Sequence, residues 1–327
     1  MRIEGLIAAT FSPMDQDGSL NLSQVPGIVE HLIKDGVSGL YVCGSTGEGP
    51  LLSGLERRQV AEAYISAVAG RIPAIVQIGH DSLAEARELA QHAQDCGADA
   101  ISAIAPRYFG CDSVDTLVAC LRQATRSVPD MPFFYYHIPA LSGIDFDMVQ
   151  FLQEAPKQLP GFCGIKYSAL SIHEYQECLD CAGDQYTILF GCHEMLLSSL
   201  AVGGYGAVGS TFNFAAPLYN SIISAYRRSN LQLAQDLQLK TVKMIHMLYN
   251  RYRGQPGFKA TMELLGQDCG PNRLPLLSLS DTEKKQLRTD LERIGFFAWG
   301  RSKGSHERIN IEEVASYKKR TAIEDKT

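Results

Sequence analysis

Short apolar runs alternate with longer amphipathic stretches through the first two thirds of the chain. The apolar runs are continuous rather than alternating with polar residues, which is typical of parallel strands that are covered on both faces. They predict eight strands, at residues 5–10, 39–42, 74–78, 100–104, 133–137, 161–166, 187–190 and 206–209. We therefore expect a buried parallel sheet.

The stretches between these strands have the spacing of helices with one buried face. Apolar residues recur there at intervals of three and four, as at Val60, Ala63 and Ala67. Several stretches begin with a serine that precedes a glutamate by three positions, as Ser53 precedes Glu56, which is a helix-capping pattern. The predicted helices are residues 23–35, 53–68, 83–96, 114–125, 147–154, 172–181, 194–202 and 216–227.

Eight strand–helix units within about 225 residues match a (β/α)8 TIM barrel in number and length. A doubly wound sheet more often has fewer strands, and it would need a glycine-rich phosphate loop after the first one. The Thr-Phe-Ser-Pro segment at residues 10–13 is no such loop. We therefore predict an α/β fold, a TIM barrel formed by residues 1–228.

Beyond residue 228 the pattern changes to helices without strands. These helices predict a C-terminal helical extension over residues 229–299, broken at the Gly-Gln-Pro-Gly segment 254–257. Its predicted helices are residues 231–253, 259–265 and 281–295. Residues 300–327 are mostly charged and polar, which predicts a solvated tail with a short helix around 311–319.

Composition narrows the range of partners. The 327 residues are 45% hydrophobic with a formal net charge of −6, which argues against nucleic acid and acidic membranes as partners. No apolar run approaches the roughly 20 residues that span a bilayer. The N-terminus lacks a signal-peptide core, and nine singly scattered cysteines suit a reducing compartment, so we expect a cytoplasmic protein. Cys178 and Cys181 form the one close pair, which we interpret as structural, and no His and acidic spacing predicts a metal.

The segment 161–168, Gly-Phe-Cys-Gly-Ile-Lys-Tyr-Ser, places Lys166 at the end of a predicted buried strand. A lysine in a low-dielectric pocket loses part of its preference for the charged form, so its amine becomes a nucleophile that condenses with a ketone. The alternative is a strand-end lysine whose stem lies on apolar surface while its amine reaches water. This segment alone leaves both interpretations open.

Two further groups follow predicted strands and would lie at the same end of the barrel, where active sites are built. Residues 44–49 are Gly-Ser-Thr-Gly-Glu-Gly, where Ser45 and Thr46 offer hydroxyls beside backbone amides to a carboxylate-sized anion. Tyr136 ends the fifth strand and is a candidate proton relay. Each group also has an alternative interpretation: residues 44–49 could be only a tight turn, and Tyr136 could be only core packing. An amine, a phenol and an anion site together suit a pyruvate-like ligand.

These three segments resemble the N-acetylneuraminate lyase and dihydrodipicolinate synthase family of class I pyruvate-dependent aldolases. Gly-Ser-Thr-Gly-Glu at 44–48, Tyr-Tyr-His-Ile-Pro at 135–139 and Gly-Ile-Lys at 164–166 follow the family's order and spacing. The resemblance implies that Lys166 forms a Schiff base with the substrate and that no separate cofactor is needed. It implies a homotetramer in which Tyr108 reaches the neighbouring subunit's site. By the same resemblance Tyr136 moves the proton, and the residues that hold the pyruvyl carboxylate are Ser45 and Thr46.

The sialic acid lyase branch fits better than the synthase branch. The synthases have an arginine where this chain has Leu141, and leucine cannot bind a carboxylate. Ser168, two residues after the lysine, is also similar to the lyases. The resemblance carries the sugar-tail contacts onto Gly191, His193, Glu194 and Ser210. His193 stands where lyases generally have aspartate, so the identity of the sugar acid is left open, as is a role for His193 without a ligand.

The implied activity is the cleavage of N-acetylneuraminate, a sialic acid, to N-acetylmannosamine and pyruvate. One alternative is an aldolase for another 2-keto-3-deoxy sugar acid that uses the same lysine. Another is a barrel that binds sialic acid or a keto acid without turnover, which the Lys-Tyr-Ser-Thr set argues against. A phosphosugar isomerase lacks the glycine-rich phosphate site expected after the seventh and eighth strands. His80 and His137 are interpreted as supporting rather than catalytic residues.

Overall fold

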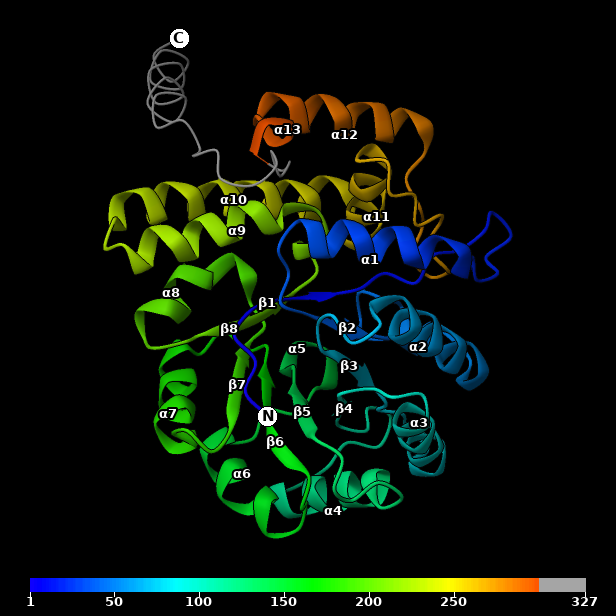
Figure 1. Ribbon diagram of the computed structural model, residues 1–327, viewed down its shortest axis with the longest axis vertical. Helices are drawn as coiled ribbons and strands as arrows, with labels where there is room; N and C mark the ends of the chain where they lie inside the picture. Colours follow the sequence, from blue (N-terminus) through cyan, green and yellow to red (C-terminus); the bar gives the residue numbers. More distant parts are fainter. Residues whose placement is uncertain (300–327) are drawn as a thin grey trace.

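The computed structural model describes residues 1–299 and contains a closed barrel of eight parallel strands in sequence order (Figure 1). The predicted TIM barrel is therefore confirmed. The strands are β1 (Gly5–Ala9), β2 (Gly39–Val42), β3 (Ala74–Gln77), β4 (Ala100–Ile104), β5 (Phe133–His137), β6 (Phe162–Tyr167), β7 (Thr187–Phe190) and β8 (Gly206–Gly209). Each predicted strand is present, with ends that differ from prediction by one residue at most.

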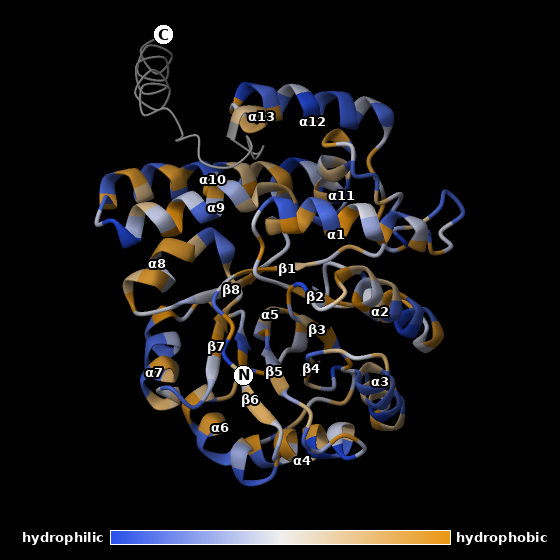
Figure 2. Cartoon of the chain, in the orientation of Figure 1, coloured by the Kyte–Doolittle hydropathy of each residue, from blue (hydrophilic) through white to orange (hydrophobic). Residues whose placement is uncertain are grey.

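Helices surround the barrel, and their apolar faces turn toward it (Figure 2). The capping box predicted at Ser53 and Glu56 is present in full. The helices after the strands are α1 (Val25–Lys34), α2 (Gly54–Val68), α3 (Leu83–Asp95), α4 (Val114–Thr125), α6 (Met148–Glu154), α7 (Ile172–Ala182), α8 (Leu196–Ala201) and α9 (Phe212–Arg227). Short helices not predicted separately are α5 (Pro139–Ser142), η1 (Leu22–Gln24), η2 (Gly49–Leu51), η3 (Ala155–Lys157) and η4 (His193–Met195).

The C-terminal extension consists of α10 (Leu231–Tyr252), α11 (Gln255–Leu264), α12 (Asp281–Arg293) and α13 (Phe296–Trp299). In Figure 1, α10 lies along α9, and α12 lies farther from the barrel. Two predicted starts were wrong. Helix α11 begins at Gln255 rather than 259, because Pro256 lies in its first turn, where proline's missing N–H costs nothing. Helix α9 begins at Phe212 because two helical segments join across a kink at Ala215. The helix expected at 311–319 lies outside the described residues.

Alternate residues along the strands belong to two different cores, one between the barrel and the helices and the other inside the barrel. Leu40 and Val42 of β2 pack outward against the helices, whereas Tyr41 between them belongs to a separate cluster inside the barrel. Tyr136 of β5 lies in the same inner cluster. Since side chains alternate along a strand, Lys166, which pairs in register with Tyr136, faces the barrel interior too. The barrel therefore brings the predicted amine and phenol into one space.

Candidate active site

Lys166 is a buried lysine without a counter-ion. Its residue is 4% exposed, and its Nζ lies 3.7 Å from the ring centroid of Tyr136 and 3.8 Å from that of Tyr41. Among residues 1–299, no carboxylate forms an ion pair with it; the one charge-bearing neighbour that raises its pKa is the Cys192 thiol. Burial outweighs that effect and lowers the pKa of Lys166 well below its usual range. The uncharged form of the amine is thus favoured by its surroundings.

Tyr136 ends β5 directly beside this amine. Burial raises the pKa of its phenol to about 12, while the hydroxyls of Ser45 and Ser168, which lie beside the phenol, oppose that rise. The phenol therefore stays protonated at neutral pH. Tyr136 can therefore accept a proton only while it donates its own proton to another group, and it is not a base that is already deprotonated. The structure brings four of the predicted site residues together at this point, from β2, β5 and β6.

Tyr41 is a site residue that sequence reasoning missed. Its ring forms the other side of the cage around Lys166 and meets the Tyr136 ring edge-on, with centroids 5.7 Å apart. Its hydroxyl donates to Ser102 Oγ at 3.1 Å. In the sequence Tyr41 stands inside an unbroken apolar run, Gly-Leu-Tyr-Val, and this pattern predicts only a core-packing role for its ring. Strand parity would have placed it inside the barrel, because Leu40 and Val42 occupy the outer face.

The loop after β2 reaches across to the loop after β8. Thr46 is buried, and its Oγ1 shares a hydrogen bond of 2.8 Å with Ser210 Oγ, whereas Ser45 is exposed beside Tyr136. One predicted carboxylate contact and one predicted sugar contact are thus in direct contact with each other. The two hydroxyl groups of the 44–49 loop thus have different neighbours, Tyr136 for Ser45 and Ser210 for Thr46.

Gly191 and Ser168 are neighbours for a steric reason. The amide of Gly191 donates to the carbonyl of Tyr167 at 2.6 Å, and a Cβ at position 191 would lie 1.8 Å from Ser168 Oγ. Only glycine leaves room for that hydroxyl. Ser168 Oγ is itself buried and has no hydrogen-bond partner within residues 1–299. A buried hydroxyl without a partner is available to a ligand.

His193 and Glu194 lie in η4, at the end of β7. The His193 ring is buried, packs edge-on against Phe212, and has no hydrogen-bond partner in the described structure on either nitrogen. Burial lowers the pKa of His193, and the Glu194 carboxylate, 3.9 Å from Nε2, opposes this. The ring is therefore a neutral hydrogen-bonding group rather than a cation. Glu194 is partly exposed.

Tyr108 is not brought to this site within the chain. Its residue is 82% exposed on the loop after β4, where its ring meets that of Phe109, which is 84% exposed. His80 lines a hollow beside Tyr136 that also includes Arg107 and Leu141. His137 is fully buried between the rings of Tyr135 and Tyr167 and faces away from the amine's cage.

A search of residues 1–299 finds no cluster of three or more histidine, cysteine or acidic side chains arranged to hold a metal ion. Nor does any helix in that range combine the length and apolarity needed to cross a bilayer. The nine cysteines are all free thiols.

Fold and site together define a class of protein: a (β/α)8 barrel whose sixth strand carries a buried, unpaired lysine beside a tyrosine at the carboxyl ends of the strands. Residues 2–294 match the model of the dihydrodipicolinate synthetase family, and the chain belongs to that family.

The relatives within this family carry a narrower name. The chain is 36% identical over 299 residues to N-acetylneuraminate lyase A of Xenopus laevis. This alignment covers 89% of the chain and 98% of the relative. The solved N-acetylneuraminate lyase of Proteus mirabilis is 38% identical with a TM-score of 0.87, over 90% of this chain and 100% of that one. The solved N-acetylneuraminate lyase of Aliivibrio salmonicida is 36% identical, with a TM-score of 0.87. The match covers 90% of this chain and 98% of that one.

Proposed function

We propose that the protein is a class I aldolase that cleaves N-acetylneuraminate to N-acetylmannosamine and pyruvate. The observation that carries the proposal is the Lys166 amine, buried without a counter-ion and in contact with the Tyr136 ring. Relatives named N-acetylneuraminate lyase, aligned over about nine tenths of the chain, support the choice of substrate.

In this proposal the reaction begins when Lys166 Nζ attacks the C2 ketone of the open-chain sugar acid. Loss of water gives an iminium ion between Nζ and C2, with no other cofactor. The C3–C4 bond then breaks, and its electron pair flows to the iminium nitrogen to give an enamine. The C4 hydroxyl loses its proton and becomes the aldehyde of N-acetylmannosamine.

The proton from the C4 hydroxyl passes through Tyr136. Because the pKa of this phenol is about 12, Tyr136 accepts the proton only as it hands its own to another acceptor. The substrate carboxylate, bound by Ser45 and Thr46, is that acceptor in our proposal. The same proton later returns to C3 of the enamine, and water then releases pyruvate and the free lysine.

Two features favour a sugar acid as the substrate over a dicarboxylic one. Leu141 stands where the synthases have an arginine, and a leucine at that position offers no charge to a second carboxylate, although Arg107 lines the same hollow beside Tyr136. Ser168 supplies a buried hydroxyl without a partner, which suits a polyhydroxyl ligand. Gly191, Glu194 and Ser210 are the further sugar-tail contacts of this proposal.

One observation favours a second candidate, an aldolase for a different 2-keto-3-deoxy sugar acid. The neutral, buried His193 differs in charge from the aspartate that lyases generally have there, and both of its nitrogens lack partners within residues 1–299. A panel of N-acetylneuraminate, 2-keto-3-deoxygluconate, and aspartate semialdehyde with pyruvate distinguishes the candidates by kcat/KM.

We also propose a cytoplasmic homotetramer. The exposed aromatic pair Tyr108 and Phe109 supports an interface at the loop after β4, through which Tyr108 would reach a neighbouring site. The free thiols are compatible with a reducing compartment. Sedimentation of the unmodified protein and of Tyr108→Ser tests the assembly, and a dissociated Tyr108→Ser is the expected result.

The decisive experiment is borohydride reduction in the presence of pyruvate, followed by mass mapping of the peptides. A single pyruvyl adduct on Lys166 is expected. A protein that turns over N-acetylneuraminate but traps no adduct on Lys166 contradicts the mechanism. A protein that traps the adduct but cleaves no sugar acid contradicts the substrate.

A further inference from the structure

The loop that carries Ser45 and Thr46 contains a buried carboxylate, that of Glu48. Its side chain has no exposed surface, and its backbone adopts a left-handed conformation with φ at 55°, which non-glycine residues seldom adopt. Such a conformation persists only where the surroundings hold it. The contacts of Glu48 therefore decide the shape of the loop.

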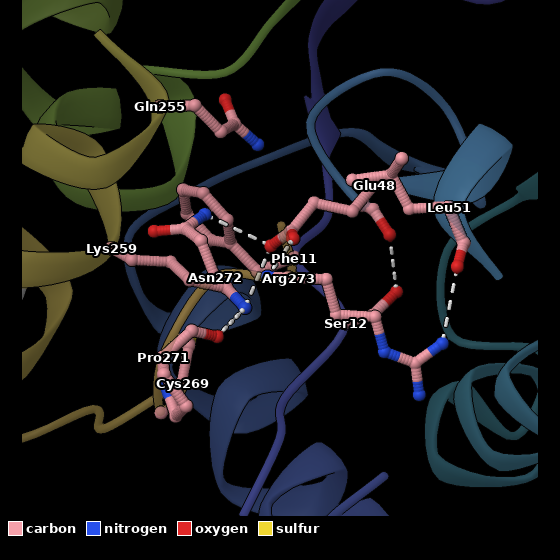
Figure 3. A network of polar contacts seen from close by, with 12 residues as sticks. Phe11, Ser12, Glu48, Leu51, Gln255, Lys259, Cys269, Pro271, Asn272 and Arg273 are labelled. Atoms are coloured by element: carbon pink, nitrogen blue, oxygen red, sulfur yellow. Dashed lines mark hydrogen bonds and ion pairs between the residues drawn. The ribbon is translucent and has the colours of Figure 1, made fainter. Parts of the chain in front are cut away.

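Within residues 1–299, the hydrogen bonds and the ion pair of the Glu48 carboxylate all come from the C-terminal extension (Figure 3). Lys259 Nζ of α11 lies 2.8 Å from Oε1, Asn272 Nδ2 donates to Oε1 at 3.0 Å, and the Arg273 amide donates to Oε2 at 2.8 Å. Lys259 is 2% exposed and also donates to the carbonyl of Pro271 at 2.8 Å. An ion pair without solvent is thus fixed by hydrogen bonds on both of its members.

A second contact from α11 reaches the predicted carboxylate site itself. Gln255 Nε2 donates to the backbone carbonyl of Thr46. Gln255 and Lys259 are four residues apart on one helix, so they lie on the same face. That one helix face contacts the loop at two points, the Thr46 carbonyl and the Glu48 carboxylate, both at or directly after the residues that present the hydroxyls.

We propose that Lys259 and Gln255 are positioning residues for keto acid binding: through Glu48 and Thr46 they hold the 44–49 loop where its hydroxyls and amides meet the carboxylate of pyruvate. The extension then forms part of the active site's support through the 44–49 loop. This inference rests on the proposed function, since it assumes that the loop binds the carboxylate.

The test measures pyruvate affinity apart from imine chemistry. Borohydride trapping on Lys166 is followed against pyruvate concentration in the unmodified protein, Lys259→Met and Gln255→Met. Lys259→Met is expected to raise the half-saturating pyruvate concentration roughly tenfold to a hundredfold, because small displacements of a binding group weaken binding strongly. Gln255→Met, which loses one hydrogen bond, is expected to raise it about threefold to tenfold. The amount trapped at saturation should stay unchanged in both.

A matched control separates this effect from general destabilisation. Lys284 pairs with Glu263 at 2.6 Å between α12 and α11 and touches no residue of the loop, so Lys284→Met should leave the half-saturating concentration unchanged. If Lys259→Met does not fold, Gln255→Met decides the matter. Half-saturating concentrations within twofold of the unmodified protein, with only a lower melting temperature, overturn the proposal.

The failure of this inference is distinguishable from failure of the proposed function. If the unmodified protein traps no pyruvate on Lys166, the proposed function is wrong, and the positioning role falls with it. If the unmodified protein traps pyruvate and the two variants trap it with the same affinity, the aldolase assignment stands and only the positioning role is wrong.

Discussion

Two lysines are buried among residues 1–299, and their surroundings differ in one respect. Lys259 has a carboxylate 2.8 Å from its Nζ, whereas Lys166 has two aromatic rings and no carboxylate. Both are similarly buried, since the residues are 2% and 4% exposed. Burial penalises a charge unless an opposite charge compensates it. The first lysine is therefore suited to hold structure together, and the second to react.

The comparison shows what makes a buried lysine a candidate nucleophile. Burial alone does not distinguish the two sites. The aromatic cage of Tyr41 and Tyr136 offers the Lys166 ammonium some cation–π stabilisation, but burial still lowers its pKa. Between Glu48 and Lys259 both charges are satisfied by further hydrogen bonds. Four predictions test this contrast.

The largest effect is expected at the unpaired lysine. Lys166→Met should abolish N-acetylneuraminate cleavage, because no amine remains to form the iminium ion. Pyruvate release in a coupled assay is the measurement. Lys157→Met is the matched control, since Lys157 is an exposed lysine paired with Glu154 at 2.8 Å, and it should retain full activity. Residual cleavage by Lys166→Met near the unmodified rate contradicts a Schiff base at this position.

The next effect is expected at the phenol beside that lysine. Tyr136→Phe keeps the ring against Nζ but removes the proton relay, so kcat should fall roughly 10²–10⁴-fold, the usual contribution of positioned acid–base groups. Tyr135→Phe is the control, because Tyr135 faces the outer core and its hydroxyl has no hydrogen-bond partner within residues 1–299. Equal losses of kcat in both variants would point to packing rather than proton transfer.

The barrel and its amine could be predicted from sequence because their signals are local. A buried parallel strand is an unbroken apolar run, and Lys166 stands where the sixth such run ends. The capping box of α2 is likewise a four-residue pattern. Tyr41 was missed because an aromatic residue in an apolar run looks like core. Only the closed barrel brings it to the amine, since three strands separate β2 from β6 in either direction around the barrel.

The paired lysine could not be predicted in the same way. Lys259 lies in an amphipathic helix, and its partner Glu48 stands 211 positions earlier in the chain. Glu48 was recognised as part of a family motif, yet no local pattern indicates that its side chain turns toward the extension. A contact of this kind depends on how the extension packs on the barrel, which periodicity does not encode.

The third prediction compares the stability of the two buried sites. Lys259→Met leaves the Glu48 charge buried without its cation, which should lower the free energy of unfolding by about 3–5 kcal/mol. Lys166→Met removes a buried amine that has no counter-ion, so its free energy of unfolding should be equal to or above that of the unmodified protein. Urea denaturation measures both. A comparable loss in both variants contradicts the contrast between the sites.

The fourth and smallest effect is a pH dependence of stability. The pKa of Lys166 is lowered in the folded protein and ordinary, about 10.4, in the unfolded chain, so the unfolded chain binds more protons between these values. Stability of the unmodified protein therefore rises with pH across that window, by at most about 1.4 kcal/mol per pH unit for this group. Lys166→Met lacks this contribution.

The advantage of Lys166→Met over the unmodified protein should accordingly shrink as pH rises through the window between the lowered folded-state pKa and the unfolded value of about 10.4. Urea denaturation of both proteins at constant ionic strength measures the difference, and because other titrating groups are common to both proteins, their contributions largely cancel. A difference that stays constant with pH means that the folded-state pKa of Lys166 is not lowered. In that case Lys166 would be as well compensated as Lys259, and the distinction between the two lysines would disappear.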